Sequence, residues 1–274
     1  MQPDELADRV RPALTGTRFG DLRWVDRTGS TNADLLVAAQ AGAPEGTVLL
    51  AEEQTAGRGR LGRTWSAPPG SSLLCSILLR PPLAPADAHL ATAAVALAAR
   101  HALAEVADVA AGLKWPNDLV VEGDGGTRKL AGVLAQAVLD GDRLDALVVG
   151  IGVNVNWPAR LPDELAEIAT AADRVAGHEV DRTALLGALL VRLDAELADL
   201  ATGEGRAALA GRYGAACVTV GQDVRVELTD EHLVGRAVGV SPSGHLVVEV
   251  TGDDGDVDRR EVAVGDVVHL RPHP

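Results

Sequence analysis

The chain has 274 residues, which allows one large domain or two with a well-buried core. Acidic residues (39 Asp and Glu) outnumber basic ones (25 Lys and Arg), and the net charge of −14 argues against a surface that binds nucleic acid or an anionic membrane. Apolar residues make up 47% of the chain but aromatic residues only 2%, so the core must be built from Ala, Val and Leu.

Cysteine and histidine usage narrows the class of protein further. Cys75 and Cys217 are too few for a disulfide framework, and the sequence has neither a signal peptide nor an uncharged apolar run of about 18 residues. We therefore expect a cytoplasmic protein with no membrane partner. The seven histidines lack the spacing of zinc ligands, so any metal should arrive with the substrate.

The first hundred residues predict helices and strands in alternation. Helices are expected at 4–14, 31–41 and 87–107, and strands at 22–26, 47–53 and 72–79. Thr31 and Asp34 fit a capping box at the start of the second helix. The hydroxyls of Ser30 and Thr31 and the free N–H groups of this helix start could also hold a polar head group, and the two interpretations are compatible.

Residues 51–65 form the most informative stretch, an apolar strand followed by a loop in which Arg58, Arg60 and Arg63 alternate with glycines. Glycine allows close backbone approach and arginine offers a planar fork for phosphate or carboxylate, so the loop is typical of an anion clamp. A solvated basic loop is the alternative. The G-x-G-x-x-G spacing here is not a dinucleotide fingerprint, because the PPG at 68–70 prevents a helix from opening.

A second stretch, residues 113–121, is interrupted by Pro116, which excludes a continuous strand. Lys114, Asn117 and Asp118 therefore crowd a break between two short extended pieces. This arrangement indicates either part of a site or an ordinary Pro-Asn-Asp turn.

Two further strands, at 129–136 and 144–156, carry candidate residues. Lys129 begins the first of them, and small neighbours, including Gly132, would let a ligand approach it, although a single lysine at a strand start is usually solvated. The second strand contains two glycines and Asn154, and glycines within a strand often mark the close approach of a ligand.

The remaining residues predict helices and then a small β-barrel. Helices are expected at 162–172, 181–201 and 204–214, with Asp181 as the cap of the second. A hairpin is expected at 123–126, and short alternating strands at 224–228, 233–240, 245–250, 260–264 and 266–270. We therefore divide the chain into a domain of residues 1–215 and a barrel of residues 216–274 that docks on it.

Four motifs resemble, in order and spacing, those of the biotin protein ligases. They are Gly29-Ser30-Thr31-Asn32, Gln54 with the loop at 57–65, Lys114-Trp115-Pro116-Asn117-Asp118 with Lys129-Leu130-Ala131-Gly132, and Gly150-Ile151-Gly152 with Asn154. The resemblance implies an α/β (α+β) fold. In this fold a mixed β-sheet flanked by helices, like that of class II aminoacyl-tRNA synthetases, precedes an SH3-like β-barrel.

The resemblance also implies an activity. Biotin and ATP would give biotinyl-5′-AMP and pyrophosphate, and biotin would then pass to one lysine of a biotin carboxyl carrier domain, with Mg²⁺ assisting. Lipoate or octanoate ligases and transferases of the same fold, and a non-catalytic biotin or adenylate sensor, are the alternatives. Only 29 residues precede Ser30, too few for the DNA-binding domain of the family's repressors. We therefore expect a monofunctional ligase that binds no DNA, as a monomer or weak homodimer.

The resemblance assigns roles to particular residues. The catalytic residues would be Lys129, Arg58, Arg60 and Asp118, with Asp118 also a candidate metal ligand beside the metal that ATP carries. The biotin-binding residues would be Ser30, Thr31, Asn32, Gln54, Gly57, Arg58, Gly59, Arg60, Lys129 and Gly132. The nucleotide-binding residues would be Arg58, Arg60, Trp65, Lys114, Asn117, Lys129 and Asn154.

Overall fold

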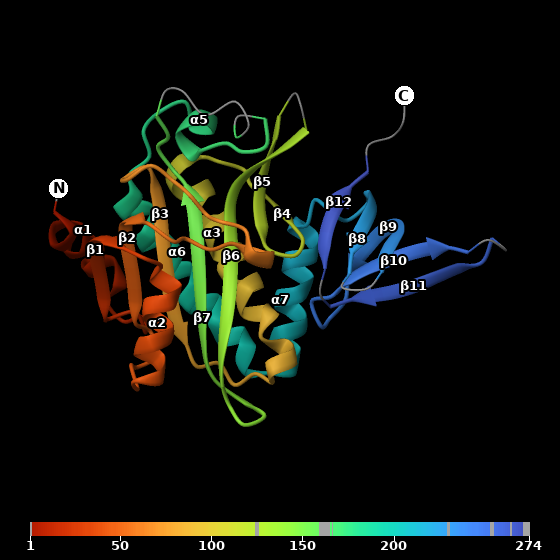
Figure 1. Cartoon of the computed structure of the whole chain (residues 1–274), viewed down its shortest axis with the longest axis horizontal. Helices are drawn as coiled ribbons and strands as arrows, with labels where there is room; N and C mark the ends of the chain where they lie inside the picture. Colours follow the sequence, from red (N-terminus) through yellow and green to blue (C-terminus); the bar gives the residue numbers. More distant parts are fainter. Residues whose placement is uncertain are drawn as a thin grey trace.

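A seven-stranded mixed sheet with helices on both faces forms the larger part of the computed structural model, and a five-stranded antiparallel sheet lies beside it (Figure 1). The structure describes residues 2–123, 126–158, 165, 167–228, 231–252, 255–263 and 265–270. The strands of the larger sheet are β1 (Leu22–Thr28), β2 (Val48–Gln54), β3 (Ser72–Leu79), β4 (Gly112–Lys114), β5 (Asp118–Gly123), β6 (Gly126–Asp140) and β7 (Arg143–Asn154). They run in the order β1-β2-β3-β7-β6-β5-β4, and only β1 and β2 are parallel.

The helices lie close to the expected positions. They are α1 (Pro3–Val10), α2 (Thr31–Gln40), α3 (His89–Ala107), α5 (Ala172–Ala176), α6 (Arg182–Ala198) and α7 (Gly203–Ala216), with short 3₁₀ turns at Arg11–Leu14, Arg60–Gly62, Pro85–Asp87 and Asp199–Ala201. Asp181 caps α6 as expected, accepting hydrogen bonds from the N–H groups of Thr183 and Ala184.

Of the helix expected at 162–172, residues 162–164 and 166 lie outside the described residues. Leu165 is helical and its carbonyl accepts from the N–H of Ala169 (2.8 Å), but the helix does not continue to 172 as expected, because the backbone at 168–170 pairs with β6. Lys129 donates from its N–H to the carbonyl of Ile168 (2.8 Å), and Thr170 donates from its N–H to the carbonyl of Lys129 (2.9 Å). The helix α5 begins only after this pairing, at Ala172.

Alternation along the strands divides the core into two layers. Leu49, Leu78 and Val148 face α2, whereas their neighbours along the same strands face the layer of α3 and α6 behind the sheet (Figure 1). The segment Pro85–Ala107 is long and apolar enough to cross a membrane, but 67% of its most apolar 18-residue stretch is buried inside the protein, as in a core helix. The Ala, Val and Leu core expected from composition is confirmed.

Two features of the central strands decide where the site forms. Pro116 breaks the chain between β4 and β5, as expected, and Lys114 pairs with Asp118 across the break. The strand β6 is longer than expected, because a two-residue turn with Gly141 at positive φ pairs Asp140 with Arg143, and β7 begins one residue earlier and ends two residues earlier than expected. In the hairpin expected at 123–126, Gly123 pairs with Gly126, and residues 124 and 125 lie outside the described residues.

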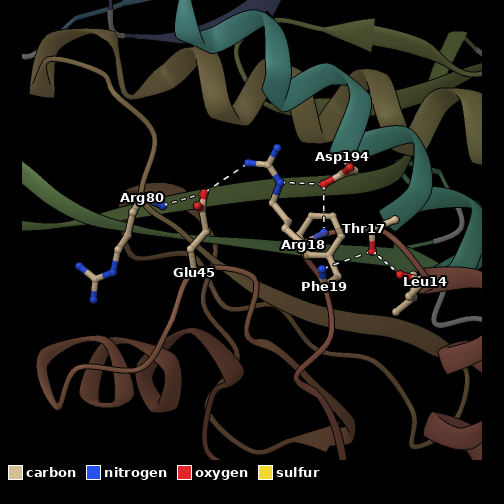
Figure 2. Close-up of polar contacts among 7 residues, drawn as sticks. All are labelled: Leu14, Thr17, Arg18, Phe19, Glu45, Arg80 and Asp194. Atoms are coloured by element: carbon tan, nitrogen blue, oxygen red, sulfur yellow. Dashed lines mark hydrogen bonds and ion pairs between the residues drawn. The ribbon is translucent and has the colours of Figure 1, made fainter.

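A network of polar contacts fixes the N-terminal segment against the larger sheet (Figure 2). The guanidinium of Arg18 donates to Asp194 on α6 (2.7 Å) and forms an ion pair with Glu45 (3.4 Å). Glu45 also accepts from the backbone N–H of Arg80 (3.3 Å). Phe19, fully buried next to Arg18, is thereby held in the core, so the start of the chain is part of the sheet's packing.

The second sheet docks against the first through its connection to α7. Its strands are β8 (Asp223–Glu227), β9 (His232–Val240), β10 (Leu246–Thr251), β11 (Val257–Val262) and β12 (Asp266–His269), in the order β11-β10-β9-β8-β12. Residue 264, at the end of one expected strand, lies outside the described residues. Val218 donates from its N–H to the carbonyl of Leu113 (2.8 Å), and the backbone N–H of Trp115 donates to the hydroxyl of Thr219 (3.2 Å). The expected docking is therefore confirmed.

His89, to which the sequence assigned no role, also lies at this junction, because its Nε2 is 2.6 Å from the carbonyl oxygen of Ser243. The domain boundary at 215/216 stays a prediction, since α7 contacts both α3 and β9.

His269 predicts a pH dependence of stability. Burial and, to a smaller extent, the positive charge of Lys114 together lower its pKa to about 4. A histidine in the unfolded chain titrates near pH 6.5. Between about pH 6.5 and 4, His269 is therefore protonated in the unfolded chain but neutral in the folded chain. Folding stability should therefore fall as the pH drops through this window. Urea unfolding of His269→Gln should show a smaller loss between pH 7.5 and 5 than the wild type shows.

The control for this experiment is His232→Gln, which removes an exposed histidine from the same sheet. Equal losses of stability in the wild type and His269→Gln would contradict the assignment.

Candidate active site

A cavity of about 280 Å³ opens on the sheet face that α2 covers, beyond the N-terminal end of this helix. On the same face as Leu78 and Val148, the strands continue with Ser76, Gly150 and Gly152, which are small. The sheet therefore lacks bulky side chains where α2 no longer covers it, and the loop after β2 and the start of β12 complete the walls.

The residues predicted for the site converge on this cavity. All of them line it except Gly57 and Lys114, and those that do are Ser30, Thr31, Asn32, Gln54, Arg58, Gly59, Arg60, Trp65, Asn117, Asp118, Lys129, Gly132 and Asn154. They come from α2, β2, β5, β6, β7 and the loops between them, so residues more than a hundred positions apart meet here.

Gly57 and Lys114 lie outside the lining for identifiable reasons. A Cβ at Gly57 would be 2.4 Å from the carbonyl oxygen of Trp65, so this glycine lets the two ends of the arginine loop approach each other. Lys114 lies on β4 near the second sheet, where its charge acts on His269. Their predicted contacts with biotin and nucleotide stay predictions.

The arginine loop closes over the cavity and reaches the second sheet. Arg60 donates to the side-chain oxygen of Asn117 (3.2 Å) and to the carbonyl oxygen of Gly265 (3.1 Å), and Arg63 forms an ion pair with Asp266. Burial lowers the pKa of Arg60, although a guanidinium keeps its charge in a protein. The loop thus brings cationic groups to the cavity in an otherwise acidic protein.

Lys129 adds a further positive charge to the cavity. Its ammonium is 2.6 Å from the carboxylate of Asp118 and 5.5 Å from the centre of the Trp65 ring. The indole of Trp65 lies close against the sheet, where a Cβ at Gly152 would be 2.5 Å from it and one at Gly132 3.1 Å. These two glycines therefore make the room for Trp65.

The opposite end of the cavity is polar and uncharged. The backbone N–H of Thr31 donates to Gln54 Oε1 (2.8 Å), and the Thr31 hydroxyl lies 3.1 Å from the same oxygen. The capping box expected for Thr31 and Asp34 is wrong, since Ser30 is the N-cap without a side-chain hydrogen bond and Asp34 accepts from the Thr28 hydroxyl. Free of capping, the hydroxyls of Ser30 and Thr31 line the cavity.

Asn117 and Asn154, both predicted to lie at the nucleotide, donate from their side-chain amide nitrogens to backbone carbonyls. Asn117 Nδ2 donates to the carbonyl of Val133 (2.9 Å), and Asn154 Nδ2 donates to the carbonyl of Thr170 (3.0 Å). Asn154 is buried and thereby fastens residues 168–170 beside Lys129. Any contact of Asn117 and Asn154 with a nucleotide would use the side-chain oxygen.

Several lining residues were not predicted from the sequence. Ser76 interrupts an apolar strand, which is a detectable signal, whereas Asp266 and Trp157 are recognisable only when the chain is folded. Cys75 also lines the cavity, but burial raises the pKa of its thiol far above the ordinary value, so it serves as an apolar wall.

The arrangement suits an amphiphilic ligand. Hydroxyls and an amide lie at the level of Gly150, and an indole and bare backbone lie at the level of Gly152. Lys129 lies over the indole, and Arg58 and Arg60 also line the cavity. Such a cavity can bind a small polar ring, hold an apolar chain, and neutralise anions that must be brought together.

Comparisons with known proteins agree with this geometry. Residues 24–154 match the model of the biotin/lipoate A/B protein ligase family, and residues 219–270 match that of the biotin protein ligase C-terminal domain. The chain is 36% identical to the biotin–[acetyl-CoA-carboxylase] ligase of Mycobacterium tuberculosis, covering 96% of this chain and 98% of the relative. It is 31% identical to the bifunctional ligase/repressor BirA of Bacillus subtilis, covering 90% of this chain and 76% of the relative.

Among solved structures, the biotin protein ligase from Aquifex aeolicus in complex with biotin and ATP is similar to this chain. The TM-score is 0.75 and the identity 29%, with 92% of this chain and 100% of the other covered. Because such relatives match over nearly their whole length, the chain belongs to the biotin/lipoate A/B protein ligase family.

Proposed function

We propose that this protein activates biotin with ATP to biotinyl-5′-AMP and then transfers biotin to one lysine of a biotin carboxyl carrier domain. The observation that carries the proposal is one cavity that has the Thr31–Gln54 pair at one end and Arg60 and Lys129 at the other. The Mycobacterium tuberculosis relative is named as a biotin–[acetyl-CoA-carboxylase] ligase, and the Aquifex aeolicus structure contains biotin and ATP.

The chemistry explains why cations gather at one end. In the first step a carboxylate oxygen of biotin attacks the α-phosphorus of ATP, and the bond to pyrophosphate breaks. Both reactants are anions, so their approach is opposed until Arg58, Arg60 and Lys129 neutralise them. Asp118 holds the ammonium of Lys129 in the cavity (2.6 Å). In the second step a carrier lysine attacks the acyl carbon, and AMP leaves.

The residues present fit magnesium only as a companion of ATP. The described residues contain no group of three or more His, Cys, Asp or Glu side chains that could hold a metal ion. Of the acids lining the cavity, Asp118 is paired with Lys129 and Asp266 with Arg63. Phosphate oxygens would therefore supply most ligands, with Asp118 as one candidate ligand, and the cation would stabilise the departing pyrophosphate.

The polar end of the cavity favours biotin over lipoate or octanoate. The Thr31 hydroxyl and the Gln54 amide can pair with the N–H and C=O groups of a cyclic urea, whereas a dithiolane ring or an alkyl end has no such groups. Polar groups left unpaired in a buried site cost roughly 1–3 kcal/mol each.

Mass spectrometry of a carrier domain incubated with the protein, biotin and Mg-ATP tests the proposal. A gain of one biotin on one lysine supports it. Binding of biotin without any transfer would favour the sensor alternative, and transfer of lipoate or octanoate instead would favour that branch of the family.

The proposal also covers the protein partner, the cellular location and the oligomeric state. A carboxylase carrier is the protein partner, the location is the cytoplasm, and the protein works as a monomer or weak homodimer. The excess of Asp and Glu over Lys and Arg supports the absence of a DNA or membrane partner.

Lys129→Ala should nearly abolish adenylate formation while the fold is retained. Lys129 would contact both reacting anions, so its loss should slow pyrophosphate release by ~10²-fold or more. Arg128→Ala, which removes an exposed charge from the neighbouring position of β6, is the control and should stay near the wild-type rate. Wild-type pyrophosphate release by folded Lys129→Ala would remove Lys129 from the site.

Arg60→Gly should let biotinyl-5′-AMP escape from the enzyme. The hydrogen bonds of Arg60 to Asn117 and Gly265 close the loop over the cavity. Losing one charged hydrogen bond costs about 1.5–3 kcal/mol, or roughly one to two decades in retention of the intermediate. The measurements are a dissociation rate for the adenylate and a streptavidin blot of albumin incubated with the variant, biotin and Mg-ATP.

Leu61→Gly is the matched control for Arg60→Gly, because it adds a glycine to the same loop without removing a charge. If the adenylate leaves Arg60→Gly no faster than it leaves Leu61→Gly, retention must be assigned to other residues.

The protein should not bind operator DNA, with or without biotin and ATP. Binding to DNA requires that positive side chains neutralise phosphates, and the net charge of −14 opposes this. A gel-shift assay at moderate salt measures it. A biotin-dependent, sequence-specific shift would show that the monofunctional interpretation is wrong.

A further inference from the structure

Asn32 lines the cavity, but its side-chain amide forms hydrogen bonds with other residues of the protein. Its nitrogen Nδ2 lies 3.2 Å from the carbonyl oxygen of Leu134 and 3.0 Å from Gln136 Oε1. A backbone carbonyl can only accept, so Nδ2 must be the atom that faces it. The oxygen Oδ1 then faces the hydroxyl of Ser76 at 2.6 Å.

The orientation of the Asn32 amide determines which group donates in the hydrogen bonds of Ser76 and Thr31. Asn32 Oδ1 can only accept, so the single proton of the Ser76 hydroxyl goes to it. The 2.7 Å contact between Ser76 and Thr31 must then use the proton of Thr31. No proton remains for the 3.1 Å contact between the Thr31 hydroxyl and Gln54 Oε1.

At the polar end of the cavity, one group is therefore a hydrogen-bond acceptor and its neighbour a donor. The hydroxyl oxygen of Thr31 keeps lone pairs that need a donor. Gln54 Oε1 accepts the backbone N–H of Thr31, which turns the other side of the amide, with its two Nε2 protons, away from Thr31. A ligand that offers an N–H beside a C=O satisfies both groups at once.

Gly150 makes the position of Asn32 possible. Ser76, Gly150 and Leu134 are paired neighbours on β3, β7 and β6, so the amide of Asn32 lies across three strands at one level. A Cβ at Gly150 would be 2.2 Å from Asn32 Oδ1, which leaves no room for any side chain there.

We propose that Asn32, Ser76 and Gly150 form a positioning unit, the Asn32 relay, which orients the hydroxyl of Thr31 for the urea ring of biotin. In this arrangement Asn32 does not touch the substrate but acts through Ser76 and Thr31. The inference rests on the proposed function, because it names what selects the head group of the substrate.

The first test compares two buried serines of β3. Ser76→Ala removes the relay hydroxyl, whereas Ser72→Ala removes a hydroxyl with no hydrogen-bond partner among the described residues. Ser76→Ala should raise the KM for biotin about tenfold or more and leave the KM for ATP and kcat near wild type, because the ATP end is untouched. Ser72→Ala should match the wild type in all three.

A second readout separates orientation from simple destabilisation. The probe is 2-iminobiotin, whose cyclic guanidinium presents N–H donors where the urea of biotin presents an acceptor. With the relay intact, the donors of Gln54 should oppose this analogue, so biotin should be strongly preferred. The backbone N–H of Thr31 still orients Gln54 in Ser76→Ala, and both ligands keep the ring N–H that faces the Thr31 hydroxyl. Ser76→Ala should therefore weaken both ligands about equally and leave the preference for biotin unchanged, whereas a general loosening of the cavity would shrink it.

If Ser76→Ala does not fold, Gly150→Ala decides the matter, with Gly239→Ala of the second sheet as its control because a Cβ there meets open space. Gly150→Ala should show the same rise in the KM for biotin. A folded Ser76→Ala with the biotin KM of Ser72→Ala, or with a smaller preference for biotin over 2-iminobiotin, would overturn the relay. Failure of the wild type to biotinylate any carrier would instead overturn the proposed function, so the two failures are distinct.

Discussion

The site depends on the absence of side chains from one part of a sheet face. Gly132, Gly150 and Gly152 stand where the alternation of the strands would otherwise direct Cβ atoms into the cavity. Their backbones let the indole of Trp65 and the amide of Asn32 lie directly against the sheet. Larger residues at these positions would fill the cavity, so no substrate could bind beside the catalytic groups.

Charge is the second organising feature. The protein is acidic, yet Arg58, Arg60 and Lys129 line one cavity. Two ion pairs lie there, Lys129 with Asp118 and Arg63 with Asp266. The carboxylates hold the cationic side chains in position. An incoming anion can share the cation with its carboxylate or displace the carboxylate, and it is then attracted by the positive charge. The cavity therefore attracts phosphate and carboxylate in a chain that otherwise repels them.

Local sequence patterns predicted most of the fold and much of the lining. The apolar runs of β3 and α3 identify buried elements, and Pro116 identifies the break between β4 and β5, because these signals depend on neighbouring residues. The capping box at Thr31 failed because its hydroxyl is drawn to Ser76, which is distant in sequence. Asp266 and residues 168–170 could not be predicted, since their positions depend on how separate segments pack.

The anchoring of the arginine loop on the second sheet has a consequence for how the two parts of the chain can be exchanged. Arg60 and Arg63 find their acceptors at Gly265 and Asp266, on the far side of the sequence from the loop itself. A chimera that joins residues 2–216 to the second sheet of a relative would keep a closed loop only if the new partner offers a carbonyl and a carboxylate at these positions. The two halves are thus matched to each other at these contacts.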